Sequence, residues 1–204
     1  MSAAPTVYVV DDDESIRSLW RWLMESNGIA VQTYASAGAF IGAYCRGDPG
    51  CLVLDVRLPG MSGLELQEYL KREDIDIPVV FVSGHGDVPT AVSALKGGAV
   101  DFIQKPFGYR EVLCIIERAF ERDARNRKNH ADHLRILERV ASLTEREREV
   151  VQRVVEGKLN RVIAEELDIS VKTVEFHRAK VMEKMGAASV AVLVQLKSQY
   201  DAAV

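Results

Sequence analysis

Side chains that could bind or accept a phosphoryl group follow the apolar runs in the first half of this chain. They are Asp11, Asp12 and Asp13 after residues 7–10, Asp55 after residues 51–54, Ser83 after residues 78–82 and Lys105 after residues 100–103. Clustered carboxylates repel one another and favour a hard divalent cation such as Mg²⁺, which can also bind phosphate oxygens. A carboxylate can then attack phosphorus, while a hydroxyl and an ammonium stabilise the other phosphoryl oxygens. The pattern predicts that Asp55 accepts a phosphoryl group, assisted by Ser83 and Lys105.

These side chains can meet only if the apolar runs lie side by side as parallel strands. Unbroken apolar runs are typical of strands buried on both faces, and residues 29–34 form a further strand-like run. Segments with helical spacing lie between the runs, at residues 14–27, 36–45, 64–71 and 87–96. Right-handed crossovers through helices place all the strand ends at one edge, where open α/β sheets bind ligands. We therefore expect a five-stranded parallel, doubly wound α/β domain over residues 1–122. In its first helix, the inward side should carry Ile16, Leu19, Trp20, Leu23 and Met24.

A helix that begins near residue 109 has no clear stop. Residues 121–130 are almost wholly polar, and apolar residues then resume near a 3.5-residue spacing, at Ala131, Leu134, Leu137 and Ala141. One interpretation of residues 123–141 is a helical linker that pairs with a copy of itself. The other is a solvated linker, because Arg127 falls where a paired seam needs an apolar residue.

Residues 142–204 have the pattern of a small all-α domain. Thr144 and Glu147 form a predicted capping box at the start of a helix that Gly157 ends. Two helices follow, at residues 160–167 and 171–185, joined by a tight turn, and the second is longer and basic. This is the plan of a helix-turn-helix. Four residues of the first should face inward: Val162, Ile163, Ala164 and Leu167.

Charge and apolar content limit the possible environments and partners. Residues 1–116 hold 9 Lys and Arg against 15 Asp and Glu, whereas residues 142–204 hold 10 of each. The acidic surplus argues against nucleic-acid binding by the first domain, and contact by the second requires local clustering of cations. The longest early apolar run, residues 7–10, is too short for a signal peptide or a membrane span. The three cysteines lack metal-ligand spacing, so we expect buried, reduced thiols and a cytoplasmic protein without membrane contact.

Four segments around the candidate phosphoryl site resemble a known family. They are Val9-Val10-Asp11-Asp12-Asp13, Leu54-Asp55 through Pro59-Gly60, Val82-Ser83-Gly84 and residues 101–107. On these motifs, residues 7 to about 122 resemble the receiver domain of two-component response regulators. The resemblance implies that Asp55 is phosphorylated and that Mg²⁺ or Mn²⁺ is bound by Asp11, Asp12, Asp55 and the backbone carbonyl of Arg57. Asp12 would be the direct ligand of the acidic pair, and Asp13 would lie outside it.

The resemblance also implies which residues respond to the phosphoryl group. Ser83 would be the switch hydroxyl and Phe102 the switch aromatic, and Phe102 lacks the hydroxyl of the tyrosine common at this position. The Lys105-Pro106 peptide resembles the cis peptide of the family. Arg57 and His85 would flank the phosphoryl group, and we hypothesise that they set its lifetime. An alternative for His85 is that it only supports its glycine-flanked loop.

Three stretches of the second domain resemble the LuxR-type helix-turn-helix of the NarL/FixJ group of response regulators. They are residues 143–147, 160–164 and 173–178. The resemblance implies that Glu175, Phe176 and Ala179 face the bases of double-stranded DNA. Phe176 replaces a small aliphatic residue, so it could pack on a thymine methyl group or turn away. Residues that would contact or approach phosphates are Arg161, Lys172, Thr173, His177, Arg178 and Lys180.

Together these patterns predict a phosphorylation-activated transcription regulator rather than an enzyme. A sensor histidine kinase would phosphorylate Asp55, and the product would form a homodimer that binds promoter DNA and acts with RNA polymerase. The predicted dimer face comprises residues 87–96, 100–103 and 109–120. The last helix, with Val190, Leu193, Val194 and Leu196, is a second candidate, unless these residues pack on their own domain's core.

Two other functions compete with this interpretation. An aspartate-nucleophile phosphohydrolase would use Asp11 and Asp13, but such an enzyme takes its nucleophile from the first strand and has no need of a helix-turn-helix. A phosphorylation-independent regulator would use its first domain only to dock proteins.

Overall fold

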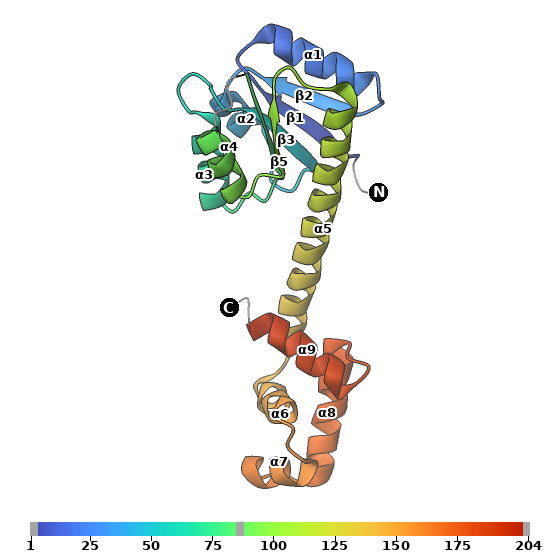
Figure 1. Cartoon of the computed structure of the whole chain (residues 1–204). Coiled ribbons are helices and arrows are strands. Elements are labelled where there is room, and N and C mark those ends of the chain that lie inside the picture. Colours follow the sequence, from blue (N-terminus) through green and yellow to red (C-terminus); the bar gives the residue numbers. More distant parts are fainter. Residues whose placement is uncertain (1–3, 85–87, 202–204) are drawn as a thin grey trace. The chain divides into compact units, whose positions relative to one another are not determined.

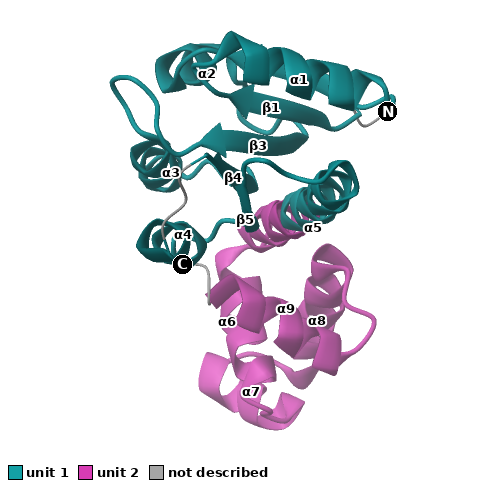
Figure 2. Ribbon diagram, turned by 45° about the horizontal axis from the view of Figure 1, so that its top comes forward, with its two compact units in different colours: residues 1–127 teal, residues 128–204 magenta. Residues whose placement is uncertain are grey.

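The computed structural model describes residues 4–84 and 88–201 of the 204-residue chain. The chain divides into two compact units, Met1–Arg127 and Lys128–Val204, which are coloured teal and magenta in Figure 2. The helix α5 (Tyr109–Ala141) continues from the first unit into the second. None of the described helices is long and apolar enough to cross a membrane.

The first unit is built on a five-stranded parallel sheet with the order β2-β1-β3-β4-β5 (Figure 1). The strands are β1 (Thr6–Val10), β2 (Ala30–Tyr34), β3 (Gly50–Asp55), β4 (Val79–Ser83) and β5 (Asp101–Gln104). Every residue of β3 and β4 is buried, which explains their unbroken apolar sequences. The strand order changes direction between β1 and β3, so the carboxyl ends of these two strands flank the usual ligand crevice of such sheets. The predicted parallel α/β fold is confirmed.

Helices cover both faces of the sheet. Residues of α1 (Glu14–Glu25) and α5 pack on one face, whereas α2 (Ala37–Ala43), α3 (Gly63–Arg72) and α4 (Val88–Lys96) cover the other. In α1, Trp20, Leu23 and Met24 are buried, but Leu19 is 43% exposed. The prediction that Leu19 faces inward is wrong, because at about 100° per residue it lies at the edge of the apolar stripe.

The second unit is an all-α domain, as predicted. It comprises α6 (Glu145–Val155), α7 (Asn160–Leu167), α8 (Val171–Met185) and α9 (Val190–Asp201), together with the end of α5. In α7, Ile163, Ala164 and Leu167 are buried, but Val162 is 39% exposed. The inward prediction for Val162 is wrong, because it lies about 100° from Ile163 around a helix that packs on only one side.

Polar caps fix the ends of these helices. The capping box predicted from Thr144 and Glu147 is confirmed at the start of α6. Ser170 caps α8 by accepting a hydrogen bond from the backbone N–H of Thr173 at 3.0 Å. Gly186 ends α8 with a φ of 61°, a conformation that glycine adopts at little cost. Side-chain caps therefore set the starts of α6 and α8, whereas α7 begins after Leu159 without a side-chain cap.

The apolar residues of α5 and α9 only partly follow the expected pattern. In the second half of α5, Ile136 and Val140 are buried, whereas Leu134 is 45% exposed. In α9, Leu193 is buried in its own domain's core, but Val194 is 39% exposed. Core packing therefore accounts for part of the last helix and leaves its other side open.

Only one of the three cysteines, Cys51, is buried. Cys45 and Cys114 are exposed free thiols, so the expectation of buried thiols is wrong for these two.

Candidate phosphoacceptor site and nucleic-acid interface

Asp11, Asp55 and Lys105 meet at the carboxyl edge of the sheet. The register that pairs Val10 with Leu54 places Asp11 and Asp55 on neighbouring strand ends. The Lys105 ammonium nitrogen Nζ lies 2.7 Å from Oδ2 of Asp11 and 3.0 Å from Oδ1 of Asp55. The peptide bond between Lys105 and Pro106 is cis. The structure thus brings together three side chains that are far apart in the sequence.

Burial and mutual attraction govern the charges of this cluster. Asp11 is 3% exposed and Asp55 is 9% exposed. Burial raises the pKa of Asp55, and hydrogen bonds from Lys105 and the Arg57 backbone only partly offset this effect. Burial lowers the pKa of Lys105, but its hydrogen bonds to the two aspartates outweigh burial and raise that pKa overall. Lys105 therefore stays protonated and supplies a fixed positive charge beside Asp55.

The backbone orients both carboxylates. The second carboxylate oxygen of Asp55, Oδ2, accepts a hydrogen bond from the N–H of Arg57 at 2.6 Å. Oδ1 of Asp11 accepts one from the N–H of Asp13 at 2.9 Å. Asp13 itself caps α1, because its carboxylate accepts a hydrogen bond from the N–H of Ser15 at 2.8 Å. Asp13 therefore has a structural role at the start of α1.

Arg17 is a site residue that the sequence interpretation missed. Its guanidinium donates hydrogen bonds of 2.8 Å to the backbone carbonyls of both Asp11 and Asp12, and it also pairs with Glu14. These contacts fix the loop that carries the acidic residues. The available signal was an arginine one helical turn after the cap residue Asp13, where a long side chain can fold back over the loop.

The predicted switch residues lie on adjacent strands. Ser83 ends β4 and is 2% exposed, and its carbonyl accepts a hydrogen bond from the N–H of Lys105 at 2.8 Å. Phe102 of β5 is half-buried and stacks against Phe81, with ring centroids 6.4 Å apart. Ser83 is therefore connected to the cluster of Asp11, Asp55 and Lys105 through the backbone of Lys105.

The two residues expected to set the phosphoryl lifetime differ in what the structure describes. Arg57 is exposed and follows Asp55 by two positions, so its side chain leaves the backbone at the solvent-facing edge of the site. His85 lies outside the described residues.

The site has the donor chemistry that a hard divalent cation requires. Asp11, Asp55 and the exposed Asp12 offer carboxylate oxygens, and Arg57, whose carbonyl could add a further oxygen, follows Asp55 by two positions. Within the described residues, 4–84 and 88–201, no three His, Cys, Asp or Glu side chains already lie in an arrangement that could hold a metal ion. The residue types fit Mg²⁺, and Lys105 occupies one oxygen each of Asp11 and Asp55.

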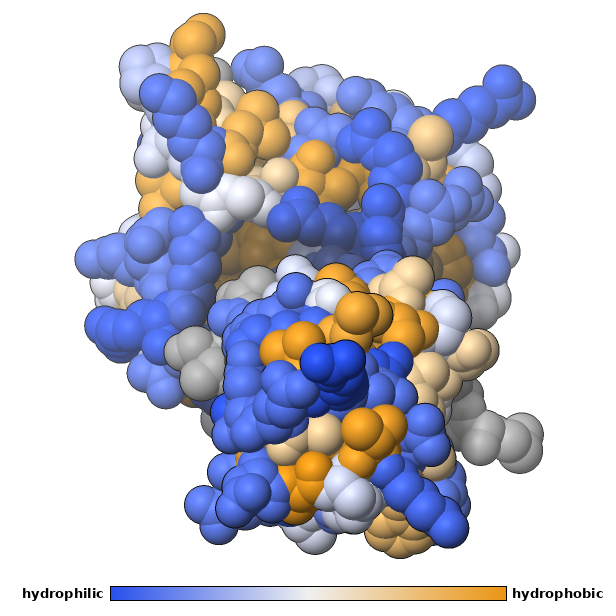
Figure 3. Space-filling view, turned by 90° about the horizontal axis from the view of Figure 1, so that it is seen from below, coloured by the Kyte–Doolittle hydropathy of each residue, from blue (hydrophilic) through white to orange (hydrophobic). Residues whose placement is uncertain are grey.

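The exposed side of α8 forms a mixed polar and apolar surface. Val174, Val181 and Met185 are buried on one side, while Glu175, Phe176 and Ala179 are exposed on the other. Phe176 is 60% exposed, so it turns outward, and its ring meets His177 at a centroid distance of 5.7 Å. Figure 3 shows the molecule from below, where hydrophobic side chains lie among a larger number of hydrophilic ones. A DNA groove offers apolar thymine methyl groups beside charged phosphates, and a mixed polar and apolar surface is suited to both.

The cations expected to meet phosphates are partly engaged within the domain. Arg178 donates a hydrogen bond from Nη1 to Oδ1 of Asn160 at 2.9 Å, which joins α8 to the start of α7. Lys180 pairs with Glu183 at 2.8 Å and Arg161 with Glu165 at 3.1 Å. The hydroxyl of Thr173 contacts that of Ser170 at 2.8 Å, and Lys172 is exposed at the start of α8. Of these residues, Arg178 is the one whose side-chain hydrogen bond joins two different helices, whereas Lys180 and Arg161 pair within their own helix.

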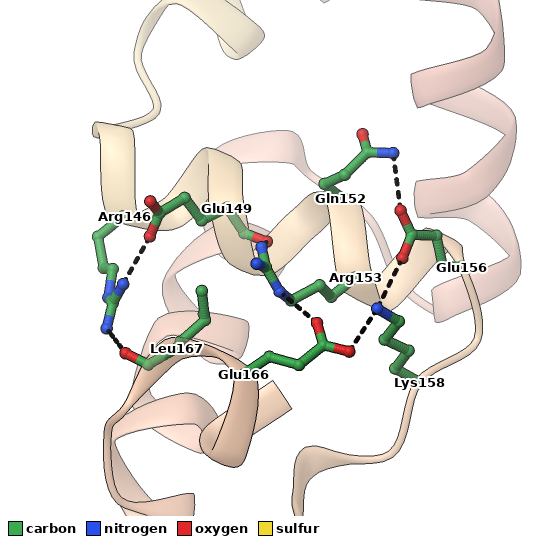
Figure 4. Close-up of polar contacts among 8 residues, drawn as sticks. All are labelled: Arg146, Glu149, Gln152, Arg153, Glu156, Lys158, Glu166 and Leu167. Carbon is green, nitrogen blue, oxygen red and sulfur yellow. Dashed lines mark hydrogen bonds and ion pairs between the residues drawn. The ribbon is translucent and has the colours of Figure 1, made fainter. Parts of the chain in front are cut away.

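A network of ion pairs holds α7 against α6, and sequence reasoning missed it (Figure 4). Glu166 of α7 accepts from Arg153 at 2.8 Å and from Lys158 at 2.6 Å. Arg146 also donates to the carbonyl of Leu167 at 2.6 Å, beside the turn that leads to α8. The network therefore supports the helix that precedes the exposed surface of α8.

Comparisons with known proteins cover both units. The family described as "Response regulator receiver domain" matches residues 7–117, and "Bacterial regulatory proteins, luxR family" matches residues 141–197. The chain is 43% identical over 190 residues to the transcriptional regulatory protein FixJ of Azorhizobium caulinodans, covering 93% of this chain and 90% of that protein. It is 46% identical over 191 residues to FixJ of Rhizobium meliloti, covering 94% of each. The solved structure of the response regulator StyR matches with a TM-score of 0.87 at 42% identity, covering 97% of this chain and 100% of that one.

Proposed function

The chain belongs to the NarL/FixJ group of response regulators, and on this basis we propose that phosphorylation of Asp55 switches the binding of promoter DNA by α8. The observation that carries the proposal is the buried cluster in which Lys105 joins Asp11 to Asp55. It combines an acceptor carboxylate with a cation that can compensate for added negative charge.

In the proposed reaction, a sensor histidine kinase supplies the phosphoryl group as phosphohistidine. An oxygen of Asp55 attacks phosphorus, the P–N bond breaks, and the departing imidazole nitrogen takes up a proton. Lys105 binds a phosphoryl oxygen through its ammonium, and Ser83 donates its hydroxyl to another. Bound Mg²⁺ or Mn²⁺, held by Asp11, Asp12, Asp55 and the Arg57 carbonyl, would supply charge neutralisation.

The response would pass from Ser83 and Phe102 to a dimer face. Three residues of α4 support that face because they expose apolar side chains: Val88 at 76%, Val92 at 42% and Leu95 at 46%. A dimer would present two copies of α8 to DNA half-sites about 10 base pairs apart, or a multiple of that spacing. Glu175, Phe176 and Ala179 would face the bases, and Lys172 would approach a phosphate.

We further propose that the DNA-bound dimer acts with RNA polymerase in the cytoplasm. Arg57 is proposed to influence the lifetime of the phosphoryl group from the mouth of the site, and so is His85. These roles rest on the family relationship and on the positions of the residues along the chain.

Beryllofluoride, which mimics an aspartyl phosphate, provides the test. Sedimentation of the full chain and its binding to a random-sequence DNA pool would be measured with and without beryllofluoride and Mg²⁺. We expect the mass to double and specific duplexes to be enriched for the native chain, but not for Asp55→Asn. An unchanged mass and unchanged enrichment in the native chain would contradict the proposal.

A further inference from the structure

The last turns of α5 are built into the second unit. Ile136 and Val140 are buried in the same apolar core as Val151, Met185 and Leu193. Alongside this packing, a cavity of about 550 Å³ adjoins Val140 and Met185, so apolar contact leaves one side of the helix end unfilled. Because apolar packing is incomplete here, polar contacts help to set the position of the end of α8 against the end of α5.

Arg139 of α5 caps the C-terminal end of α8. Its Nη1 donates a hydrogen bond to the backbone carbonyl of Met185, the last residue of α8, at 2.9 Å. A Cβ atom added to Gly186 would lie 3.1 Å from the guanidinium carbon of Arg139, so the guanidinium covers the capping residue. The last carbonyls of a helix have no partner within it and carry partial negative charge, which a cation satisfies.

Lys184 makes the reciprocal contact from α8. Its Nζ donates to the carbonyl of Ser142, the residue that follows α5, at 3.1 Å. It also pairs at 2.6 Å with the buried carboxylate of Glu147, which accepts a second hydrogen bond from the N–H of Thr144. Each helix end thus provides a cation for a carbonyl at the end of the other helix, and the start of α6 is tied to both.

We propose that Arg139 and Lys184 are positioning residues for DNA reading, which lock the C-terminal end of α8 to the last turn of α5. This role rests on the proposed function only in taking α8 as the helix that reads DNA. With this role, the last turn of α5 contributes to DNA binding by holding α8 in position. Neither cation needs to touch DNA, because the structure already gives each a partner at a helix end.

The test uses the full chain with Arg139→Ala, the conservative rescue Arg139→Lys, and Arg135→Ala as a matched control. Arg135 lies one turn earlier on α5, and its 68% exposed side chain pairs only with Asp132 among the contacts described. Lys184→Gln tests the reciprocal contact. Hydrogen exchange would be followed at residues 185–187, and affinity for a duplex selected by the native chain in beryllofluoride would be measured across a salt series. Circular dichroism would verify that each variant keeps its helices.

We expect Arg139→Ala to speed exchange at residues 185–187 by about tenfold and to weaken binding of the selected duplex by about tenfold, with Arg139→Lys restoring most of both. The salt dependence should stay unchanged, since no phosphate contact is lost. Lys184→Gln should act in the same direction and Arg135→Ala should have no effect. Unchanged exchange at residues 185–187 in Arg139→Ala would overturn the lock. A reduced salt slope would overturn it in favour of a phosphate contact. Failure of the native chain to select any duplex would instead count against the proposed function, and hydrogen exchange would still decide the lock.

Discussion

The ammonium nitrogen of Lys105 lies 3.0 Å from Oδ1 of Asp55, and this hydrogen bond joins the segment after β5 to the end of β3. The same nitrogen also holds Asp11, so one cation compensates for two buried carboxylates. Any chemistry at Asp55 must therefore rearrange the contacts of Lys105. If Asp55 is phosphorylated as proposed, Lys105 would respond to the change at Asp55 as well as bind the phosphoryl group.

Lys105→Met should destabilise the first unit by about 2 kcal/mol, because it leaves Asp11 and Asp55 without their shared cation. The loss should fall below the roughly 3–5 kcal/mol of a fully buried pair, since the Lys105 side chain is 19% exposed. Mg²⁺ should raise the melting temperature of the variant more than that of the native chain. Thermal unfolding with and without Mg²⁺ measures both effects, with the exposed Lys96→Met as control. Equal stabilisation by Mg²⁺ in variant and native chain would show that Lys105 does not compete with the metal, and no stabilisation of either would count against a metal site at these carboxylates.

Sequence patterns predicted the fold and the centre of the site because both follow from local rules. Unbroken apolar runs, each followed by a polar residue, indicated parallel strands. The carboxyl ends of parallel strands lie at one edge of the sheet, which brings Asp55 and Lys105 together. The contacts of Asp123 could not be predicted in this way, because no strand-end pattern links this residue of α5 to its partner Gly50 at the start of β3. The wrong prediction for Val162 has a local cause. In a helix as short as α7, the apolar residues spread around the helix and do not show which side will pack on the core.

Phe176→Ala should weaken binding of a selected duplex by about tenfold if the outward-facing ring packs on a thymine methyl group. Replacing that thymine with uracil, which lacks the methyl group, should cost the native chain about fourfold and cost the variant nothing further. Fluorescence anisotropy with the two duplexes measures this difference. Val192→Ala, at a 37% exposed site on α9, is the matched control. Equal losses with uracil in native and variant chains would show that Phe176 is not the contact.

Arg178→Met and Asn160→Ala should each weaken specific DNA binding by about fivefold, because they break the same link between α8 and α7. The double variant should lose little more than either single variant, since paired residues are not additive. Affinity across a salt series separates this role from a phosphate contact. A phosphate contact by Arg178 would reduce the salt slope by about one in Arg178→Met but not in Asn160→Ala.

Asp123 should make the stability of the first unit fall as pH rises. It is a buried carboxylate of α5 that accepts hydrogen bonds from the N–H of Gly50 at 3.2 Å and from Nε of Arg127 at 2.8 Å. Alanine cannot replace Gly50, because its Cβ would lie 2.0 Å from the carbonyl oxygen of Thr6. Burial raises the pKa of Asp123 above its ordinary value of 3.8, and Arg127 only partly opposes this effect. The folded state therefore holds the proton more tightly than the unfolded chain, so the contribution is fully present below pH 3.8 and is lost as pH rises through the raised pKa.

Asp123→Asn should remove this part of the pH dependence while keeping an acceptor for Gly50. Urea unfolding between about pH 3.5 and 7 would be followed by the fluorescence of Trp20 and Trp22, which both lie in α1 and so report on the first unit. The exposed Glu121→Gln, two residues earlier on α5, should keep the native pH dependence. If Asp123→Asn and the native chain lose stability in parallel over this range, the buried carboxylate of Asp123 is not its source. A steeper loss at low pH in the native chain would mean that Arg127 outweighs burial and holds Asp123 ionised.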